Sequence, residues 1–144
     1  MPRFSQSSLH KLETCHPVLQ ALMHEVIRYF DVKIIEGFRS LERQKELFDK
    51  GMSKISSGGR HNYNPSLAID CLPWPFSSED WSRPEVFAGM ARYCQATFHQ
   101  MQRDGRIENN YKLIWGGDWD DDPSTAHRFF DGPHLELHIL PIES

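Results

Sequence analysis

The sequence lacks the features of an exported, membrane-bound or nucleic-acid-binding protein. Among its 144 residues 16 are basic and 20 acidic, so a formal net charge of -4 gives no overall positive field that would attract phosphate. No stretch approaches the roughly 20 apolar residues of a membrane helix. Residues 1–6 contain no apolar run typical of a signal peptide, so we expect synthesis in the cytoplasm without an export signal. These absences disfavour nucleic acid as a partner and insertion into a membrane.

Cysteine is also scarce, with Cys15, Cys71 and Cys94 far apart in the chain. An odd number of cysteines without a C-x-x-C pair indicates reduced thiols. Internal repeats and low-complexity tracts are absent. With 39% apolar and 25% charged residues, the composition is that of one ordinary globular domain, which we expect to span residues 1–144.

Periodic apolar residues predict three helices. The first lies within residues 14–30, where Pro17 suits a first helical turn. The second covers residues 40–50 and ends before a glycine. The third and longest covers residues 82–104 and opens with a capping box at Ser82.

Four short apolar or alternating runs predict strands at residues 32–36, 67–72, 111–115 and 134–139. Helices and strands do not alternate regularly, as they do in proteins with parallel sheets. We therefore expect an α+β fold in which a small, mostly antiparallel sheet packs against about three helices.

Asp70 is unusual because it lies inside a predicted strand, where an unpaired carboxylate is costly to bury. Hydrogen bonds from the backbone or from an arginine would explain it equally well from the strand alone. His61 upstream and His134 at the start of the last strand favour a metal site. Two imidazoles and a carboxylate are a normal ligand set for catalytic zinc, which suits these ligands better than magnesium or calcium does.

Several short motifs together resemble a known enzyme superfamily. In chain order they are Glu36-Gly37-Phe38-Arg39-Ser40, Gln44, His61, Ala68-x-Asp70, Trp115-Gly116-Gly117-Asp118-Trp119 and Asp131-x-x-His134-Leu135-Glu136. Over residues 12–137 the chain resembles the zinc peptidases of the D-alanyl-D-alanine carboxypeptidase superfamily. Within it, the chain is most similar to small phage endolysins that are L-alanyl-D-glutamate peptidases. The resemblance implies the fold of D-Ala-D-Ala peptidases and hedgehog domains.

The resemblance also implies a role for individual residues. His61, Asp70 and His134 match the three zinc ligands of the family. Asp131 lies where the family has its catalytic acid, and Arg39 matches the arginine that faces the developing oxyanion. For Arg39, a purely structural salt bridge with a nearby glutamate, Glu36 or Glu42, is the alternative explanation.

The sequence departs from the family pattern S-x-H-x-x-G-x-A-x-D around the first ligand. Gly59 replaces the serine and Ser66 replaces the glycine. The interval from His61 to Asp70 is also two residues longer than in the pattern. We expect this loop to bulge so that the ligand geometry is restored.

The last predicted strand leaves alternatives open. His134, Glu136 and His138 share one face of it, so His138 is an alternative ligand and Glu136 an alternative base. A solvated strand edge explains His138 equally well. We favour His134 as the ligand and expect Glu136 to orient a ligand histidine, a common need in zinc sites.

Other residues are candidates for contact with the substrate, namely Gln44, Trp115, Asp118 and His127. Gln44 facing water and His127 in an ordinary surface loop are the simpler explanations. Calcium binding by Asp118 with residues 120–122 is a further possibility. This run matches no EF-hand spacing, and a solvated acidic loop explains it better.

The sequence thus predicts a zinc-dependent peptidase that cleaves peptidoglycan stem peptides, with the L-alanyl-D-glutamate bond implied by the resemblance. A carboxypeptidase that removes terminal D-alanine is the nearest alternative. A non-catalytic, zinc-stabilised wall-binding domain is another, although such a domain needs neither Asp131 nor Arg39. We expect one zinc ion and a monomer. We also expect release to the cell wall through a holin, as in the phage lysins that the chain resembles.

Overall fold

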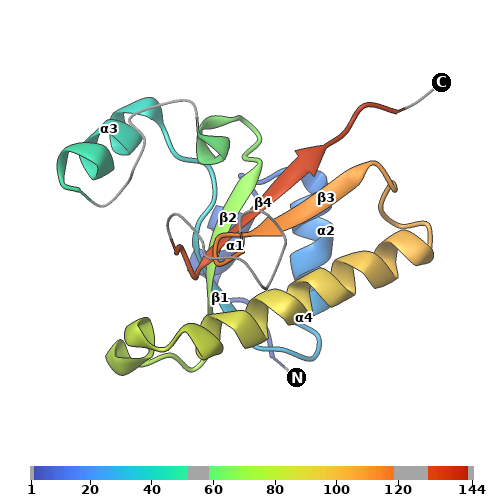
Figure 1. Cartoon of the computed structure of the whole chain (residues 1–144), viewed down its shortest axis with the longest axis horizontal. Helices are drawn as coiled ribbons and strands as arrows, with labels where there is room; N and C mark the ends of the chain where they lie inside the picture. The colour runs from blue at the N-terminus through green and yellow to red at the C-terminus, as the bar shows by residue number, and fades with distance from the viewer. Residues whose placement is uncertain (1, 52–58, 119–129, 143–144) are drawn as a thin grey trace.

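The computed structural model describes residues 2–51, 59–118 and 130–142 (Figure 1). Its centre is a four-stranded sheet in the order β1-β2-β4-β3, and each neighbouring pair is antiparallel. The strands are β1 (Val32–Glu36), β2 (Ala68–Pro73), β3 (Tyr111–Trp115) and β4 (His134–Ile139). These strands confirm the predicted α+β fold with an antiparallel sheet.

The helices of the described residues include one that the sequence pattern did not predict. They are α1 (Gln6–Leu12), α2 (Pro17–Val26), α3 (Leu41–Asp49) and α4 (Pro84–Arg103), with two short 3-10 helices, η1 (Arg60–Asn62) and η2 (Ser78–Ser82). The unpredicted helix is α1, which is two turns long and buries only Ser8 and Leu12. Helix α2 is shorter than the predicted segment at both ends.

Local sequence explains where α3 begins and ends, but it misled the prediction for α4. The Ser40 hydroxyl accepts a hydrogen bond from the Arg43 backbone at 3.1 Å, and Gly51 follows the helix with φ of 74°. The predicted capping box at Ser82 is wrong. Ser82 Oγ instead donates to the Glu79 carbonyl at 2.9 Å, within η2, and α4 has no side-chain cap.

The core lies where α2 and α4 pack together and α4 covers one face of the sheet (Figure 1). Phe87, Met90 and Phe98 of α4 are buried there at helical spacing. All three cysteines are buried, free thiols, as expected, and burial raises the pKa of Cys15 and Cys94 to about 12. Within the described residues, no helix is long and apolar enough to cross a bilayer.

Strands β2 and β4 place their alternate residues on two faces of the sheet. Ile69 pairs with Leu135, and both belong to the core cluster. The next pair along the ladder is Asp70 and His134, whose side chains therefore lie on the other face. The strand register thus brings two polar residues together that are 64 positions apart in the chain.

Candidate metal centre

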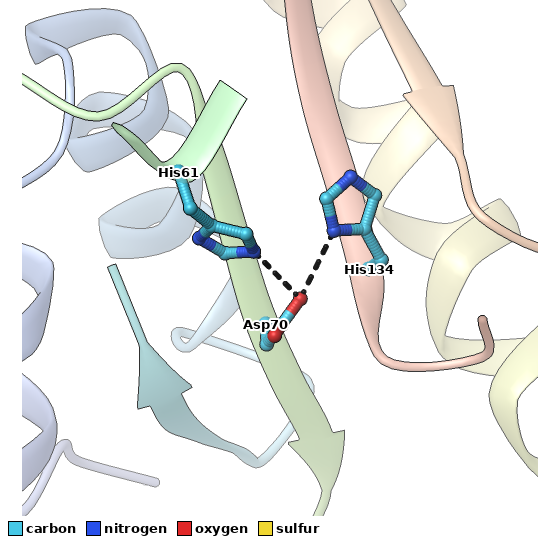
Figure 2. Close-up of side chains that lie close together, drawn as sticks. All are labelled: His61, Asp70 and His134. Carbon is cyan, nitrogen blue, oxygen red and sulfur yellow. Dashed lines mark hydrogen bonds and ion pairs between the residues drawn. The ribbon is translucent and has the colours of Figure 1, made fainter. Parts of the chain in front are cut away.

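Asp70 lies between two imidazole rings, those of His61 and His134 (Figure 2). Its Oδ1 atom is 3.1 Å from Nε2 of His61 and 3.1 Å from Nδ1 of His134. One nitrogen from each ring and one carboxylate oxygen lie within 4.8 Å of one another, close enough to hold one metal ion. The predicted ligands thus form a possible metal-binding site.

The remaining nitrogen of each histidine is held by another hydrogen bond. Nδ1 of His61 donates to the Gly37 carbonyl at 2.7 Å, and Nε2 of His134 donates to Glu136 Oε1 at 2.8 Å. Because a carbonyl only accepts, His61 carries a proton on Nδ1, and Nε2 is the atom that faces the site. Such outer hydrogen bonds fix the tautomer and orientation of metal-binding histidines.

His61 reaches the site from η1 rather than from the sheet. Its carbonyl accepts a hydrogen bond from the Arg39 backbone at 2.7 Å, which ties η1 to the segment between β1 and α3. The acceptor for its ring, Gly37, leaves no room for a side chain, because a Cβ atom there would overlap Thr14 and the carbonyl of Lys11. A residue other than glycine would displace the carbonyl that orients His61.

The longer interval before Asp70 is anchored at Ser66, where the family pattern has glycine. This residue is fully buried, and its hydroxyl donates to the Ala68 carbonyl at 2.6 Å. Its backbone also bonds to Thr14 and His16, in the connection between α1 and α2. These contacts hold the end of the loop in place just before β2 begins.

The guanidinium of Arg39 contacts Glu36, Gln44 and Asp70. It pairs with both oxygens of Glu36 at 3.0 and 2.6 Å and donates to Gln44 Oε1 at 2.8 Å. Its Nη2 atom is also 3.5 Å from Asp70 Oδ2. The salt bridge with Glu36 therefore exists, and it holds the guanidinium beside the candidate ligands. Burial opposes the charge, but the bonds and charge of Glu36 outweigh it and raise the pKa of Arg39.

Asp131 borders the cluster, with Oδ2 3.9 Å from Nδ1 of His134. Its side chain is 34% exposed, more than any of the three candidate ligands. Burial and the negative charge of Asp70 raise the pKa of Asp131, although His134, His61 and Arg39 oppose the shift. A carboxyl group with a raised pKa at the open side of the cluster is suited to carry a proton.

Charge within the cluster is balanced by the histidines. Burial disfavours the charged form of Asp70, but the charge of His61 and the hydrogen bond from His134 outweigh it and hold its pKa well below the usual range. Burial likewise opposes a charge on His134, yet bonds to Asp70 and Glu136 raise its pKa to about 10. The bond from His134 overcomes burial at Glu136 and lowers its pKa to about 2. A metal ion bound here must therefore displace a proton from His134.

The residues predicted to contact substrate lie mostly inside the protein. Gln44 is 1% exposed and bonds to Arg39, so it does not face water. Trp115 is buried and donates from Nε1 to the Gly132 carbonyl at 2.8 Å. Asp118 is 1% exposed and accepts from Arg92 at 2.7 Å. The predicted contact at His127 lies outside the described residues, as do residues 120–122 of the acidic run.

Sequence reasoning missed the contacts around Glu136. Its Oε2 atom is 2.6 Å from Nε2 of His138 and 3.4 Å from Nε of Arg60. His138 thus contacts Glu136 and is not among the residues that converge as possible ligands. For the contact between Arg60 and Glu136, the only indication in the sequence was that Arg60 lies next to His61.

The chain is similar to known proteins in both sequence and structure. The sequence model of one family, phage L-alanyl-D-glutamate peptidase, matches residues 1–138. The chain is 30% identical to the peptidoglycan L-alanyl-D-glutamate endopeptidase CwlK of Bacillus subtilis (strain 168), over 74% of this chain. The match spans 60% of the length of CwlK.

A solved structure is also similar. The crystal structure of the L-Ala D-Glu endopeptidase ChiX of Serratia marcescens has a TM-score of 0.66 and 25% sequence identity, and the match covers 95% of this chain and 91% of ChiX. These findings confirm the resemblance that the motifs indicated.

Proposed function

The chain belongs to the phage L-alanyl-D-glutamate peptidase family, and from this premise we propose that it is a zinc-dependent endopeptidase acting on peptidoglycan stem peptides. The proposed bond is that between L-alanine and D-glutamate, which the names of CwlK and ChiX also give. The observation that carries the proposal is the convergence of His61, Asp70 and His134 beside Asp131 and Arg39.

The donor set fits zinc. Two imidazole nitrogens and one carboxylate oxygen supply three protein ligands and leave further positions for water or substrate, as in catalytic zinc sites. The bonds from Gly37 and Glu136 orient the two histidines toward the shared site. When bound, zinc polarises the scissile carbonyl and makes water a stronger nucleophile.

We assign proton transfer to Asp131. Its carboxylate is the group on the open side of the cluster, and its pKa is raised, so it accepts a proton more readily near neutral pH than a solvated aspartate does. It takes the proton of the attacking water and passes it to the leaving amine. The aspartate side chain is short, so the substrate must bind close to it.

We assign charge stabilisation to Arg39. Glu36 and Gln44 fix its guanidinium on three sides, so little reorganisation is needed when negative charge develops on the carbonyl oxygen. An arginine guanidinium is charged at neutral pH, and the contact with Glu36 raises the pKa of Arg39 further. A non-catalytic wall-binding domain would need neither this arginine nor Asp131.

In this proposal the protein leaves the cytoplasm through a holin and so reaches its substrate. The family's description as a phage peptidase supports this route. Peptidoglycan is the partner that the proposed active site binds.

Digestion of purified peptidoglycan tests the reaction, the bond and the metal together. The metal content of the protein is measured first. The protein is then incubated with sacculi in three ways: alone, with chelator, and with chelator followed by zinc. The released ends are identified by mass spectrometry. We expect new D-glutamate amino termini that disappear with chelator and return with zinc. Release of free D-alanine would select the carboxypeptidase instead, and bound zinc without new ends would favour the wall-binding domain.

A further inference from the structure

An ion pair ties helix α4 to the turn that follows β3. Nη2 of Arg92 donates to Asp118 Oδ2 at 2.7 Å, and Nη1 donates to Gln95 Oε1 at 2.6 Å. The guanidinium also lies over the ring of Trp115, 5.2 Å from its centroid. Burying the carboxylate of Asp118 is costly without a charged partner, so this pair fixes the turn against α4.

The same turn is bonded to the segment that carries Asp131 and His134. The Asp131 backbone donates to the Gly116 carbonyl at 2.8 Å, and the Gly116 backbone donates to the His134 carbonyl at 2.8 Å. The indole of Trp115 donates to the Gly132 carbonyl, also at 2.8 Å. Residues 115–118 therefore hold the backbone of residues 131–134 through several hydrogen bonds.

Contact between these two segments is tight at Gly116. A Cβ atom on this glycine would overlap the carbonyl oxygen of Asp131 and lie 3.0 Å from the Cβ atoms of Asp131 and His134. The backbones of the turn and of the segment are therefore in close contact at this point. A shift of the turn is thus transmitted directly to Asp131.

We propose that Arg92 and Asp118 are positioning residues for the peptidase reaction, because through the turn at residues 115–118 they fix the backbone of Asp131 relative to His134. This inference rests on the proposed function and gives Asp118 a different role from contact with substrate. The pair touches neither the candidate ligands nor the reacting atoms. Its effect on the reaction is exerted entirely through the position of Asp131.

Four variants of the 144-residue, zinc-loaded chain test the proposal. Arg92→Met and Asp118→Asn break the ion pair, and Arg92→Lys keeps a positive charge that can still reach Asp118. Arg103→Met is the matched control, because Arg103 is an exposed arginine of the same helix whose side chain bonds to Gln100 and to no other residue in the part of the chain that the structure describes. Each variant is measured for zinc content, for kcat and KM on a soluble stem-peptide substrate, and for amide hydrogen exchange at Asp131 and His134.

For Arg92→Met and Asp118→Asn we expect kcat to fall about tenfold, since small misplacements of a catalytic group are costly, with KM within about twofold of wild type. Exchange at Asp131 and His134 should be faster, and zinc content unchanged. Arg92→Lys should recover part of kcat, and Arg103→Met should match wild type.

Two results would overturn the proposal. One is unchanged exchange at Asp131 in both pair-breaking variants, because the pair then does not hold the segment. The other is faster exchange with wild-type kcat, because the held position is then not needed for the reaction. An inactive wild-type protein would instead refute the proposed peptidase function, and the exchange rates would still decide whether the ion pair holds the segment.

Discussion

Strands β2 and β4 present two faces, and only one of them carries the candidate ligands. One face is apolar and fully buried against the helices, and consists of Ile69, Cys71, Leu135 and Leu137. The other face carries the polar residues Asp70, His134 and Glu136. Both faces are made by alternate residues of the same two segments, so each strand contributes to the core and to the site at once.

This comparison shows how the register of one strand pair fixes the site. Pairing Ile69 with Leu135 also pairs Asp70 with His134. A slip by one residue would move the whole apolar set to the polar face, so burial of the core selects the register that assembles the candidate ligands. Changes on one face should therefore affect stability, and changes on the other should affect metal and activity.

The largest expected effect on the polar side is that of Asp131→Asn. The amide has nearly the same shape but cannot carry the proton, so we expect kcat to fall by about 10²–10⁴. Zinc content and the midpoint of thermal unfolding should stay close to those of wild type. Activity within tenfold of wild type, measured on peptidoglycan, would remove Asp131 from the reaction.

The opposite pattern is expected on the apolar face. Leu135→Ala leaves a cavity in the core and should lower the free energy of unfolding by about 2–5 kcal/mol. Zinc stoichiometry and kcat should change little while the protein is folded, as urea denaturation and metal analysis would show. Leu140→Ala is the matched control, because Leu140 follows β4 but is 50% exposed. Loss of zinc from folded Leu135→Ala would contradict the claim that the apolar face determines stability alone and the polar face determines metal binding.

A smaller effect, on zinc affinity, is expected for Glu136, which contacts the candidate ligand His134. In Glu136→Gln the group that orients His134 loses its charge, so we expect zinc affinity to fall about 10–100-fold. Competition with a chelating dye would measure it. Glu42→Gln, at an exposed position of α3, should leave the affinity unchanged. Equal affinities in the two variants would contradict the orienting role.

The smallest expected effect is the change with pH in the stability of the metal-free protein. The pKa of His134 is raised from 6.5 to about 10, so its contribution to stability is complete below pH 6.5 and is lost as pH rises toward 10. We expect urea denaturation to show a loss of about 1 kcal/mol between pH 6.5 and 7.5. Measurements should stop near pH 8.5, because the raised thiol pKa values of the buried cysteines add a further loss above pH 9.

Zinc should reverse this trend, because a higher pH removes the proton that competes for His134. In the metal-free His134→Gln variant the loss between pH 6.5 and 8.5 should disappear. If His134→Gln still loses the full amount of stability over this pH range, a group other than His134 causes the loss.

Sequence patterns predicted much of the fold because strong periodicity extends over whole elements. The four strands and α3 lie within a residue of their predicted bounds, and the helix from Pro84 matches its long apolar stripe. Helix α1 was missed because its seven residues bury only one apolar side chain and give no period. Ser82 was wrongly predicted as a cap because its hydroxyl donates to the Glu79 carbonyl within η2 and accepts no hydrogen bond from the first turn of α4.

Asp70 was predictable as a candidate ligand because a carboxylate is rare inside a strand, and the family motifs supplied His61 and His134. The residues that hold these three side chains were not predictable. Gln44 and Asp118 are buried where they bond to Arg39 and Arg92, which are 5 and 26 residues away in the chain. Polar residues are predicted to face water unless the partner is known, and only the tertiary structure supplies the partner. The pairing of Arg92 with Asp118 had no signal in the sequence, since Arg92 lies in the middle of an ordinary amphipathic helix.

The central claim is that the polar face of β2 and β4 holds a catalytic zinc ion. Anomalous X-ray diffraction at the zinc edge, from crystals of protein shown to be active, tests it most directly. We predict a single strong peak bounded by Nε2 of His61, Oδ1 of Asp70 and Nδ1 of His134. Active protein with no zinc peak there, or with its peak elsewhere, would contradict the claim.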